Sequence, residues 1–455
     1  MFKKVLVANR GEIAVQIIRA LHEMKIEAVA VYSVADEDSL FVQMADEAIC
    51  IGDAQPQKSY LNMQNIVSAA NLTGCDAIHP GYGFLSENAE FAQLCADCQI
   101  NFIGPSPEVI ELMGNKSKAR STMKDAGVPV IPGSDGMLSG LEEAKQVASK
   151  IGYPVMLKAA DGGGGKGIRR IQSEMELEKA FVDAKREAQT SFGNADLYLE
   201  KIIEDAKHIE MQVMADKHGN AIYLPERDCS LQRSNQKLVE ESPCVLVNED
   251  ERSQMGKTVI QAVHHLNYYN TGTFEFLMDS DHNFYFMEMN TRLQVEHTVT
   301  EEVTGLELIK MQIQVANGDQ LEVTQDQVKI DGHAIEVRIN AENPAQNFQP
   351  SPGILEDLFL PIGTLGVRID SGVKSNSIIP PFYDSMIAKC IVHMPSRKRA
   401  TTKMARLLTE LSVAGVKTNQ FFLHDLIEDA KFETADFNTK YVEDHFLKEW
   451  QANAK

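Results

Sequence analysis

The sequence predicts an α/β protein that begins with a doubly wound parallel sheet. Apolar, strand-like runs at residues 3–8 and 28–32 flank a stretch at 11–24 whose apolar residues recur at helical spacing. Further short β segments end at Ile78 and Ile103, each directly before turn residues. Strands that alternate with helices over roughly the first 110 residues are typical of a parallel sheet with helices on both faces.

The N-terminal pattern predicts a Rossmann-like topology without a site for NAD. A dinucleotide site needs GxGxxG at the turn between the first strand and the first helix. Gly81-Tyr-Gly-Phe-Leu-Ser86 supplies only GxG, lacks the third glycine and comes late in the pattern. Gly104-Pro-Ser-Pro107 then ends this part of the chain.

The rest of the chain predicts a mixed arrangement of strands and helices. Pro154–Lys158 is an apolar strand that ends at a glycine-rich loop, and His333–Ile339 is a strand of the C-terminal part. Pro350-Ser-Pro-Gly353 and Ile379-Pro-Pro381 mark turns, and residues 398–411 have helical spacing. We therefore expect a mixed C-terminal domain.

Size and charge limit the classes of function. The chain has 455 residues, enough for about three domains. Hydrophobic residues make up 44% and charged residues 24%, which is ordinary for a globular protein. The net charge of -21 argues against general binding to nucleic acid or to anionic membranes. It leaves room for a local basic pocket that binds a polyanion such as ATP.

The composition favours a cytoplasmic protein. No apolar run approaches the roughly 20 residues of a membrane span. The apolar part of Met1–Ala8 is too short for a signal peptide, and Asn9-Arg-Gly-Glu12 follows at once. Seven cysteines, an odd number, are scattered through the chain, which indicates reduced thiols. Cys95 and Cys98 form a lone CxxC, which we interpret as two thiols on a helix.

The stretch Glu288–His297 carries the strongest functional signal. Read as a strand, it alternates between two faces, so that one face holds Glu288, Asn290, Arg292, Gln294 and Glu296. A core strand does not normally carry such a row, because buried charge needs partners. The wall of an active site does carry one.

The preceding segment predicts a metal site. Thr273–Leu277 and Phe284–Glu288 flank the polar turn Ser280-Asp-His-Asn283, which predicts a hairpin. A turn centred between its two middle residues places Glu275 directly opposite Glu288, and like charges facing each other destabilise a sheet. A cation such as Mg2+, which favours carboxylate oxygens, would relieve this repulsion. Two solvated carboxylates on an exposed face are the alternative.

The glycine-rich loop predicts contact with phosphates. Asp161-Gly-Gly-Gly-Gly-Lys-Gly167 follows the strand that carries Lys158, and consecutive glycines let backbone N–H groups approach phosphate oxygens. It is not a Walker A loop, because Ala160 and Gly167 stand where that motif needs Gly and Ser or Thr. A flexible linker is the alternative, but the apolar strand and flanking lysines favour a mobile phosphate lid.

Other segments are ambiguous by themselves. Glu226–Lys237 is dense in polar groups, which suits either a binding site or a solvated loop. Tyr82 is either a core aromatic or a substrate contact. Lys116, taken alone, is interpreted as an exposed lysine. Arg338 shares a strand face with Glu336, where an exposed ion pair is the alternative to a binding role.

Together these segments resemble the biotin carboxylase family of the ATP-grasp superfamily over essentially the whole chain. The matching blocks are Ala8–Ala14, His79–Asn88, the glycine-rich loop, Glu226–Ser230, Glu288–His297 and Gly332–Ala341. The resemblance implies an N-terminal biotin carboxylase domain at 1–114, an ATP-grasp region at 115–330 with its lid at about 130–203, and a C-terminal domain at 331–447.

The resemblance also implies a set of site residues. ATP is expected at Lys116, Lys158, Gly164, Gly165, Glu200, Lys201, Ile202, Ile203, His208, Gln232, Asn235, Glu275, Leu277 and Glu288. Two Mg2+ or Mn2+ ions are expected at Glu275, Glu288 and Asn290. Bicarbonate is expected at Lys237, Arg292, Gln294 and the Val295 amide, with Glu296 as general base. Biotin is expected at Tyr82 and Arg338, and the catalytic set is Glu296, Arg292, Arg338 and Lys237.

The implied reaction is the carboxylation of biotin by ATP and bicarbonate through carboxyphosphate. The sequence lacks the Ala-Met-Lys-Met signature of a biotinylated domain, so biotin is expected on a separate biotin carboxyl carrier protein. The resemblance implies a homodimeric, free-standing subunit of bacterial acetyl-CoA carboxylase that works with carboxyltransferase subunits. Alternatives are a subunit of a pyruvate or other acyl-CoA carboxylase, another bicarbonate-using ATP-grasp ligase, or an ATP-binding module without catalysis.

The chain departs from the family pattern at three positions. Many members have Gln-Arg-Arg-His-Gln-Lys where this chain has Gln232-Arg-Ser-Asn-Gln-Lys237. Asn235 keeps the ability to hydrogen-bond a ribose, whereas Ser234 removes a positive charge. Lys166 replaces a common arginine and keeps its charge but not its bidentate geometry.

Overall fold

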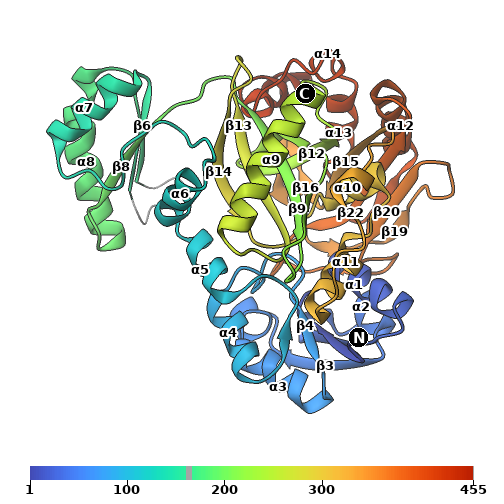
Figure 1. Cartoon of the computed structure of the whole chain (residues 1–455). Coiled ribbons are helices and arrows are strands. Elements are labelled where there is room, and N and C mark those ends of the chain that lie inside the picture. The colour runs from blue at the N-terminus through green and yellow to red at the C-terminus, as the bar shows by residue number, and fades with distance from the viewer. Residues whose placement is uncertain (160–166, 454–455) are drawn as a thin grey trace. The chain divides into compact units, whose positions relative to one another are not determined.

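The computed structural model describes residues 1–159 and 167–453. Gly164, Gly165 and Lys166 of the predicted lid lie outside the described residues. The chain divides into two compact units (Figure 1). Unit 1 comprises Met1–Gly114, Lys207–Glu275 and Met289–Lys455, and unit 2 comprises Asn115–Ala206 and Phe276–Glu288.

The N-terminal sheet of unit 1 has the predicted parallel architecture. Its strands lie in the order β3-β2-β1-β4-β5, and neighbouring strands run parallel. This order reverses at β1, as in doubly wound folds. The strands are β1 (Lys4–Val7), β2 (Glu27–Ser33), β3 (Glu47–Gly52), β4 (Ala77–His79) and β5 (Asn101–Phe102). The helices are α1 (Gly11–Glu23), α2 (Leu40–Met44), α3 (Met63–Thr73), α4 (Ala89–Asp97) and α5 (Pro107–Gly114).

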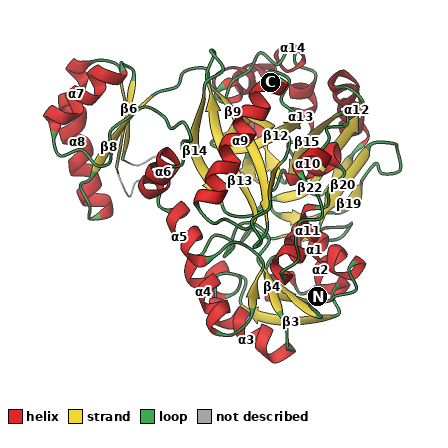
Figure 2. Cartoon of the chain, in the orientation of Figure 1, coloured by secondary structure: helices red, strands yellow, loops and turns green. Residues whose placement is uncertain are grey.

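Helices cover both faces of this sheet, as Figure 2 shows by its colours. Val5 and Val7 of β1 pack in one apolar cluster with α1, and Leu6 packs in another with α3 and α4. Strand residues alternate between faces, so a strand covered on both sides must be apolar at every position. This explains the uninterrupted apolar run that predicted β1. Cys95 lies on α4, Cys98 caps it, and all seven cysteines of the chain are free.

A second, mostly antiparallel sheet has the order β14-β13-β9-β11-β12-β15-β22-β20, with β10 beside β9. Its strands are β9 (Lys207–Ala215), β10 (Ala221–Tyr223), β11 (Arg227–Arg233), β12 (Gln236–Ser242), β13 (Asn270–Met278), β14 (Phe284–Asn290), β15 (His333–Asn340), β20 (Val367–Ser371) and β22 (Met386–Met394). Adjacent β13 and β14 confirm the predicted hairpin. The turn is centred on Asp281, because the Asp279 N–H donates to the Asn283 carbonyl at 3.1 Å, and not between Asp281 and His282 as predicted. Strands β11 and β12 replace the solvated loop that was one reading of Glu226–Lys237.

The C-terminal part is mixed, as predicted, and its apolar core lies between β15, β22 and helices α12 and α13. The remaining helices of unit 1 are α9 (Glu249–His265), α10 (His297–Thr304), α11 (Leu308–Asn317), α12 (Arg397–Glu410), α13 (Gln420–Ile427), α14 (Ala430–Glu433) and α15 (Leu447–Asn453). Short strands form three further pairs: β16 (Glu342–Asn343) with β17 (Gln349–Pro350), β18 (Gly353–Ile354) with β21 (Ile378–Ile379), and β19 (Asp357–Phe359) with β23 (Ser412–Ala414).

Unit 2 contains a small antiparallel sheet in the order β7-β6-β8. Its strands are β6 (Val155–Ala159), β7 (Ile168–Ile171) and β8 (Leu197–Lys201), and its helices are α6 (Lys116–Asp125), α7 (Leu141–Ile151) and α8 (Glu174–Phe192). Val155 and Leu157 of β6 pack in one apolar cluster with α7 and α8. No helix in the described part of the chain is both long and apolar enough to cross a membrane.

The prediction that Glu288–His297 forms one continuous strand is wrong. Strand β14 ends at Asn290, and α10 begins at His297. The chain leaves the sheet because the Thr291 N–H donates to Glu87, at 3.1 Å, instead of to a ladder partner. A turn at Gln294, whose carbonyl accepts from the His297 N–H at 3.3 Å, then starts the helix.

A buried carboxylate, Glu241 of β12, holds β15 and α12 by ion pairs. Its Oε2 lies 2.8 Å from His333 Nε2 and 2.6 Å from Arg397 Nε. Burial alone would raise the pKa of Glu241, but His333 and Arg397 hold it well below its usual range. A depressed pKa stabilises the fold above the unfolded-state value and loses this effect as pH falls.

Glu241→Gln is therefore expected to destabilise the protein by about 2–3 kcal/mol at pH 7, as for a lost charged hydrogen bond. The difference from wild type should shrink as pH falls below about 4.5, because the unfolded wild-type carboxyl then takes up a proton. Urea unfolding at pH 7 and at pH 4 measures this. An equal difference at both values would contradict the assignment of the ion pairs.

Candidate active site

Lys237 lies at the centre of a buried ionic cluster in unit 1. Its Nζ is 2.6 Å from Glu296 Oε1 and 3.2 Å from Glu275 Oε1, and it also contacts Glu210. The strand β12 presents Lys237 directly after a tight turn in which Ser234 and Asn235 both have positive φ, of 49° and 62°. Such a turn matches the twist of a two-stranded hairpin.

The cluster keeps its acids and bases charged. Burial alone would lower the pKa of Lys237, but its three carboxylate neighbours raise it well above its usual value. Burial would raise the pKa of Glu296, but Lys237 and Arg338 hold it below its usual range. His208 lies 3.1 Å from both Glu210 and Glu275, which raise its pKa to about 9 against the effect of burial.

Two members of the cluster, Glu210 and Arg227, were missed in the sequence. Arg227 is 0% exposed, and its Nη2 lies 3.0 Å from Glu210 Oε2. It also donates to Gln212 at 3.1 Å and contacts Gln294. This guanidinium therefore compensates the deepest carboxylate and fixes the side chain of a predicted bicarbonate ligand.

The loop after β14 delivers the other predicted residues to the same cluster. Gln294 Nε2 donates to Glu275 Oε1 at 2.7 Å, and Asn290 Nδ2 donates to the same oxygen at 2.8 Å. Arg292 donates to Asn290 Oδ1 at 2.8 Å and to Glu87 at 2.8 Å. Four residues of the predicted polar row, Asn290, Arg292, Gln294 and Glu296, thus converge, although a loop and not a strand carries most of them. Glu87 is a further partner that the sequence did not indicate.

Oxygen atoms suited to a divalent cation are present beside this cluster. Carboxylate and amide oxygens are ligands that Mg2+ accepts. Asn290 meets Glu275 through its Nδ2, and its amide oxygen accepts from Arg292 at 2.8 Å, so the amide must turn before both side chains offer oxygens to one cation. His208, Glu210 and Glu275 each bring one potential ligand atom within 4.8 Å of the others. Glu288, the third predicted metal ligand, is a residue of unit 2.

Arg338 joins the cluster to a cavity of about 400 Å3 within unit 1. Its Nη2 donates to Glu296 Oε2 at 2.8 Å and lies 2.5 Å from Glu240 Oε1. The predicted residues that line the cavity are Tyr82, Lys237, Arg292, Val295 and Arg338, and Phe84, Phe382 and Tyr383 add apolar surface. Arg338 is thus no exposed surface pair, and the cavity suits a small, partly apolar substrate.

Two of the sequence blocks meet at this cavity. Asn9 donates through Nδ2 to the carbonyls of Pro80 and Tyr82, at 2.7 Å each. Gly81 has φ of +62°, and a Cβ there would lie 2.9 Å from Asn9 Nδ2. This close approach explains why the turn before Tyr82 needs glycine.

A cavity of about 540 Å3 in unit 2 collects several predicted ATP residues, namely Lys116, Lys158, Glu200, Leu277 and Glu288. Lys158 Nζ lies 2.5 Å from Glu200 Oε2, and alternation along β6 points this lysine away from the apolar cluster. Lys116 and Lys118 also line this cavity, and neither has an ion pair with a residue of the described ranges.

Other predicted ATP residues line neither cavity. Lys201 Nζ donates to the carbonyls of Gly152 and Tyr153, at 3.1 and 3.2 Å, and Ile202 is buried. The residues concerned are Lys201, Ile202, Ile203, His208, Gln232, Asn235 and Glu275. Gln232 lies opposite Lys237 in the β11–β12 ladder, and Asn235 occupies its turn. Their assignment to ATP remains a prediction.

Ser234, one of the positions that depart from the family pattern, hydrogen-bonds to Glu443. Its N–H and its hydroxyl both donate to Glu443 Oε1, at 2.7 and 3.1 Å. Glu443 lies in a single π-helical turn, Val442–Phe446, before α15. The serine therefore ties the hairpin to the C-terminal segment of unit 1.

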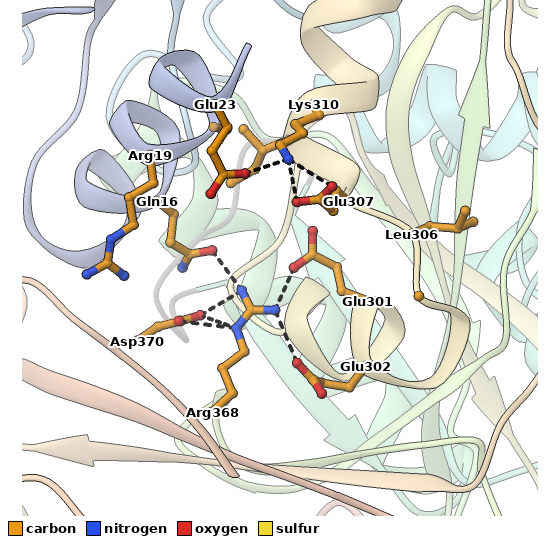
Figure 3. Close-up of a pocket in the computed structure, with 13 residues that line it drawn as sticks. Gln16, Arg19, Glu23, Glu301, Glu302, Leu306, Glu307, Lys310, Arg368 and Asp370 are labelled. Atoms are coloured by element: carbon orange, nitrogen blue, oxygen red, sulfur yellow. Dashed lines mark hydrogen bonds and ion pairs between the residues drawn. The ribbon is translucent and has the colours of Figure 1, made fainter. Parts of the chain in front are cut away.

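Another cavity of unit 1, of about 410 Å3, lies beside α1, α10 and α11 (Figure 3). Figure 3 shows Arg368 between Glu301, Glu302 and Asp370, with N···O distances of 2.8, 3.5 and 2.9 Å. Lys310 is similarly placed between Glu23 and Glu307. These ion pairs leave an excess of carboxylates over cations, and none of the predicted site residues lines this cavity.

Comparisons with known proteins agree with this arrangement. The family models "Biotin carboxylase, N-terminal domain", "Carbamoyl-phosphate synthase L chain, ATP binding domain" and "Biotin carboxylase C-terminal domain" match residues 1–110, 115–324 and 336–444. The chain is 54% identical to biotin carboxylase 1 of Bacillus subtilis (strain 168) over 444 residues, which cover 97% of this chain and 98% of that protein.

Solved structures agree as well. A biotin carboxylase–β,γ-ATP complex from Campylobacter jejuni is similar with a TM-score of 0.92 and 48% identity, covering 98% of this chain and 99% of that one. The biotin carboxylase domain dimer of Hydrogenobacter thermophilus 2-oxoglutarate carboxylase, with MgADP, ADP and bicarbonate, has a TM-score of 0.91 and 49% identity, covering 98% of each chain. The chain therefore belongs to the biotin carboxylase family, ATP-dependent ligases that carboxylate biotin with bicarbonate.

Proposed function

We propose that this chain carboxylates biotin on a separate carrier protein, in the first half-reaction of acetyl-CoA carboxylase, with Lys237, Arg292, Glu296 and Arg338 as its catalytic residues. These roles are supported by the position of Glu296 between two cations. It contacts Lys237 on one side and Arg338 on the other, and both cations line one cavity. A base between two cations is suited to a substrate that must be both bound as an anion and deprotonated.

Bicarbonate is proposed to bind at Lys237, Arg292, Gln294 and the Val295 amide. Glu296 then removes its proton, for which a carboxylate within hydrogen-bond reach is required. When Lys237 binds the substrate anion, its ion pair with Glu296 becomes weaker. The pKa of Glu296 therefore rises, and its carboxylate becomes a better base. The deprotonated bicarbonate attacks the γ-phosphate of ATP and gives carboxyphosphate and ADP.

Biotin is proposed to occupy the cavity lined by Tyr82 and Arg338. Carboxyphosphate breaks down to carbon dioxide and phosphate, and the phosphate takes the proton from the ureido nitrogen of biotin. This nitrogen then attacks carbon dioxide and gives carboxybiotin. The Arg338 guanidinium stabilises the oxygen that becomes negative, because a fixed cation is most effective where charge develops. The apolar wall of Phe84, Phe382 and Tyr383 limits access of water to the reactive carbon.

ATP is proposed to bind through Lys116, Lys158 and the lid amides of Gly164 and Gly165. Glu275, Glu288 and Asn290 would hold Mg2+ or Mn2+, which when bound offsets the charge of the phosphates. Lys116, with no ion pair among the described residues, and Lys158 supply fixed positive charge on the protein side.

The biological setting is also part of the proposal. A biotin carboxyl carrier protein would present biotin, and carboxyltransferase subunits would consume the carboxybiotin, with the enzyme acting as a cytoplasmic homodimer. The dimer named for the 2-oxoglutarate carboxylase domain supports the oligomeric state. The same relative supports a second candidate, in which the carboxyl group passes to a 2-oxo acid instead of acetyl-CoA.

Release of ADP by the purified protein tests the proposal. With Mg2+ and bicarbonate present, free biotin should stimulate ADP release severalfold, and omission of bicarbonate should remove the stimulation. ADP release that is indifferent to biotin would instead indicate another bicarbonate-using ligase. The final acceptor is then identified by adding carrier and carboxyltransferase with acetyl-CoA or with a 2-oxo acid.

A further inference from the structure

Strands β12, β15 and β22 carry four charged side chains on one face of the sheet. Glu240 lies opposite Glu336, and Arg338 lies opposite Lys389. The two glutamates and the lysine are 0% exposed. Like charges directly opposite each other destabilise a sheet, and their burial adds a further cost. Such an arrangement is unfavourable for stability, which points to a functional reason for it.

Glu240 contacts Arg338 diagonally across the ladder, within reach of two long side chains. Its Oε1 lies 2.5 Å from Arg338 Nη2, which also donates to Glu296 at 2.8 Å. Neither Glu240 oxygen has a hydrogen bond among the described residues, so the contact is an ion pair without hydrogen-bond geometry. Arg338 is therefore shared between two carboxylates, only one of which is the proposed base.

We infer that Glu240 is a positioning residue that holds the Arg338 guanidinium in place when Glu296 turns to its substrate. The inference rests on the proposed roles of Glu296 and Arg338. To accept a proton, Glu296 must lose ion pairs that favour its charged form, because those pairs reduce its basicity. The second carboxylate, Glu240, keeps Arg338 at the cavity. Because it also pairs with Arg338, the ion pair between Arg338 and Glu296 is weaker.

Charged groups from neighbouring segments act on Glu240, namely Lys237 on its own strand, Arg338 and Glu336 on β15, and Glu296 before α10. Lys389 on β22 acts on Glu336, to which the Thr298 hydroxyl of α10 also donates. Burial raises the pKa of Glu240, Arg338 opposes the shift and Glu296 adds to it, with the result that its pKa rises toward neutral pH.

This position predicts a pH dependence with a definite sign. A carboxylate with a raised pKa binds a proton as pH falls toward and below neutrality. Protonated Glu240 no longer shares the charge of Arg338, so Glu296 carries the full ion pair and becomes a weaker base. Biotin carboxylation should therefore decline on the acidic side of neutral pH, and Glu240→Gln should resemble the low-pH wild type at every pH.

The test compares pH profiles of biotin-dependent turnover for the full-length wild type and three variants. Glu240→Gln should lower kcat about tenfold above neutral pH, corresponding to a loss of about one pKa unit in the basicity of Glu296, and should lose the acidic limb. Its KM for ATP should stay unchanged. Glu240→Asp, which keeps the charge, should restore the limb and most of kcat.

Glu336→Gln is the matched control from the opposite strand. Burial and Glu240 raise the pKa of Glu336 to about 8, so Glu336 is already protonated over the range in which Glu240 titrates, and its replacement should leave kcat and the acidic limb close to those of wild type. If Glu240→Gln does not fold, Glu240→Asp still tests the inference, because loss of the acidic limb in a variant that keeps the carboxylate would contradict it.

Several results would overturn the inference. They are a normal profile in Glu240→Gln, an equal loss of ATP affinity and turnover in that variant, or loss of the acidic limb in Glu240→Asp or Glu336→Gln. A wild type without biotin-stimulated ADP release would instead overturn the proposed function, which makes the two failures distinguishable.

Discussion

Glu296→Gln should reduce biotin-dependent turnover by about 100-fold to 10,000-fold, the range that a general base contributes. The amide keeps the size of the side chain but cannot accept a proton from bicarbonate. The fold should survive, because Lys237 retains Glu210 and Glu275, and Arg338 retains Glu240. Steady-state ADP release and equilibrium binding of ATP separate the two effects, and ATP affinity should remain close to that of wild type.

Glu301→Gln provides the matched control for this substitution. Glu301 is a partly buried carboxylate in the middle of α10, but it pairs with Arg368, at 2.8 Å, in the cavity of Figure 3. Its replacement should leave biotin-dependent turnover within about twofold of the wild-type value. Near-normal turnover in Glu296→Gln would refute the assignment of the base.

Arg227→Met should lower the free energy of unfolding by about 3–5 kcal/mol, because removing one partner of a buried ion pair leaves an uncompensated charge. Arg227 is 0% exposed, and it contacts Glu210, Gln212 and Gln294. Turnover should fall as well, since Gln294 loses the donor that fixes its amide. Urea unfolding followed by circular dichroism measures the stability.

Arg406→Met is the corresponding surface control. Arg406 pairs with Glu410 one helical turn away, and the side chains are 42% and 45% exposed. Exposed pairs of this kind contribute at most about 0.5 kcal/mol. A loss of stability in Arg227→Met no larger than in Arg406→Met would show that the buried guanidinium is not needed to compensate Glu210.

Local patterns in the sequence were sufficient for much of the fold. The apolar run before α1 predicted β1, and the polar turn Ser280–Asn283 predicted the hairpin of β13 and β14. The alternation over Glu288–His297 predicted which side chains converge but not the backbone that carries them. A loop anchored by Glu87 produces the same convergence, and this contact joins residues 205 positions apart in the chain.

The partners inside the cluster depend on pairings between distant strands. His208, Glu210 and Gln212 alternate along β9, so the strand rule applied to Glu288–His297 would also have selected Glu210. The register that places Glu240 opposite Glu336 joins strands more than 90 residues apart in sequence. No local pattern specifies that register, because it is fixed by the packing of the whole sheet.

Transfer of labelled bicarbonate to biotin is the most direct test of the central claim. Purified protein is incubated with ATP, Mg2+, free biotin and 14C-bicarbonate, and acid-labile label on biotin is compared with ADP released. The account predicts label on biotin that requires ATP and disappears in Glu296→Gln. Release of ADP by the wild-type protein without label on biotin would contradict the account.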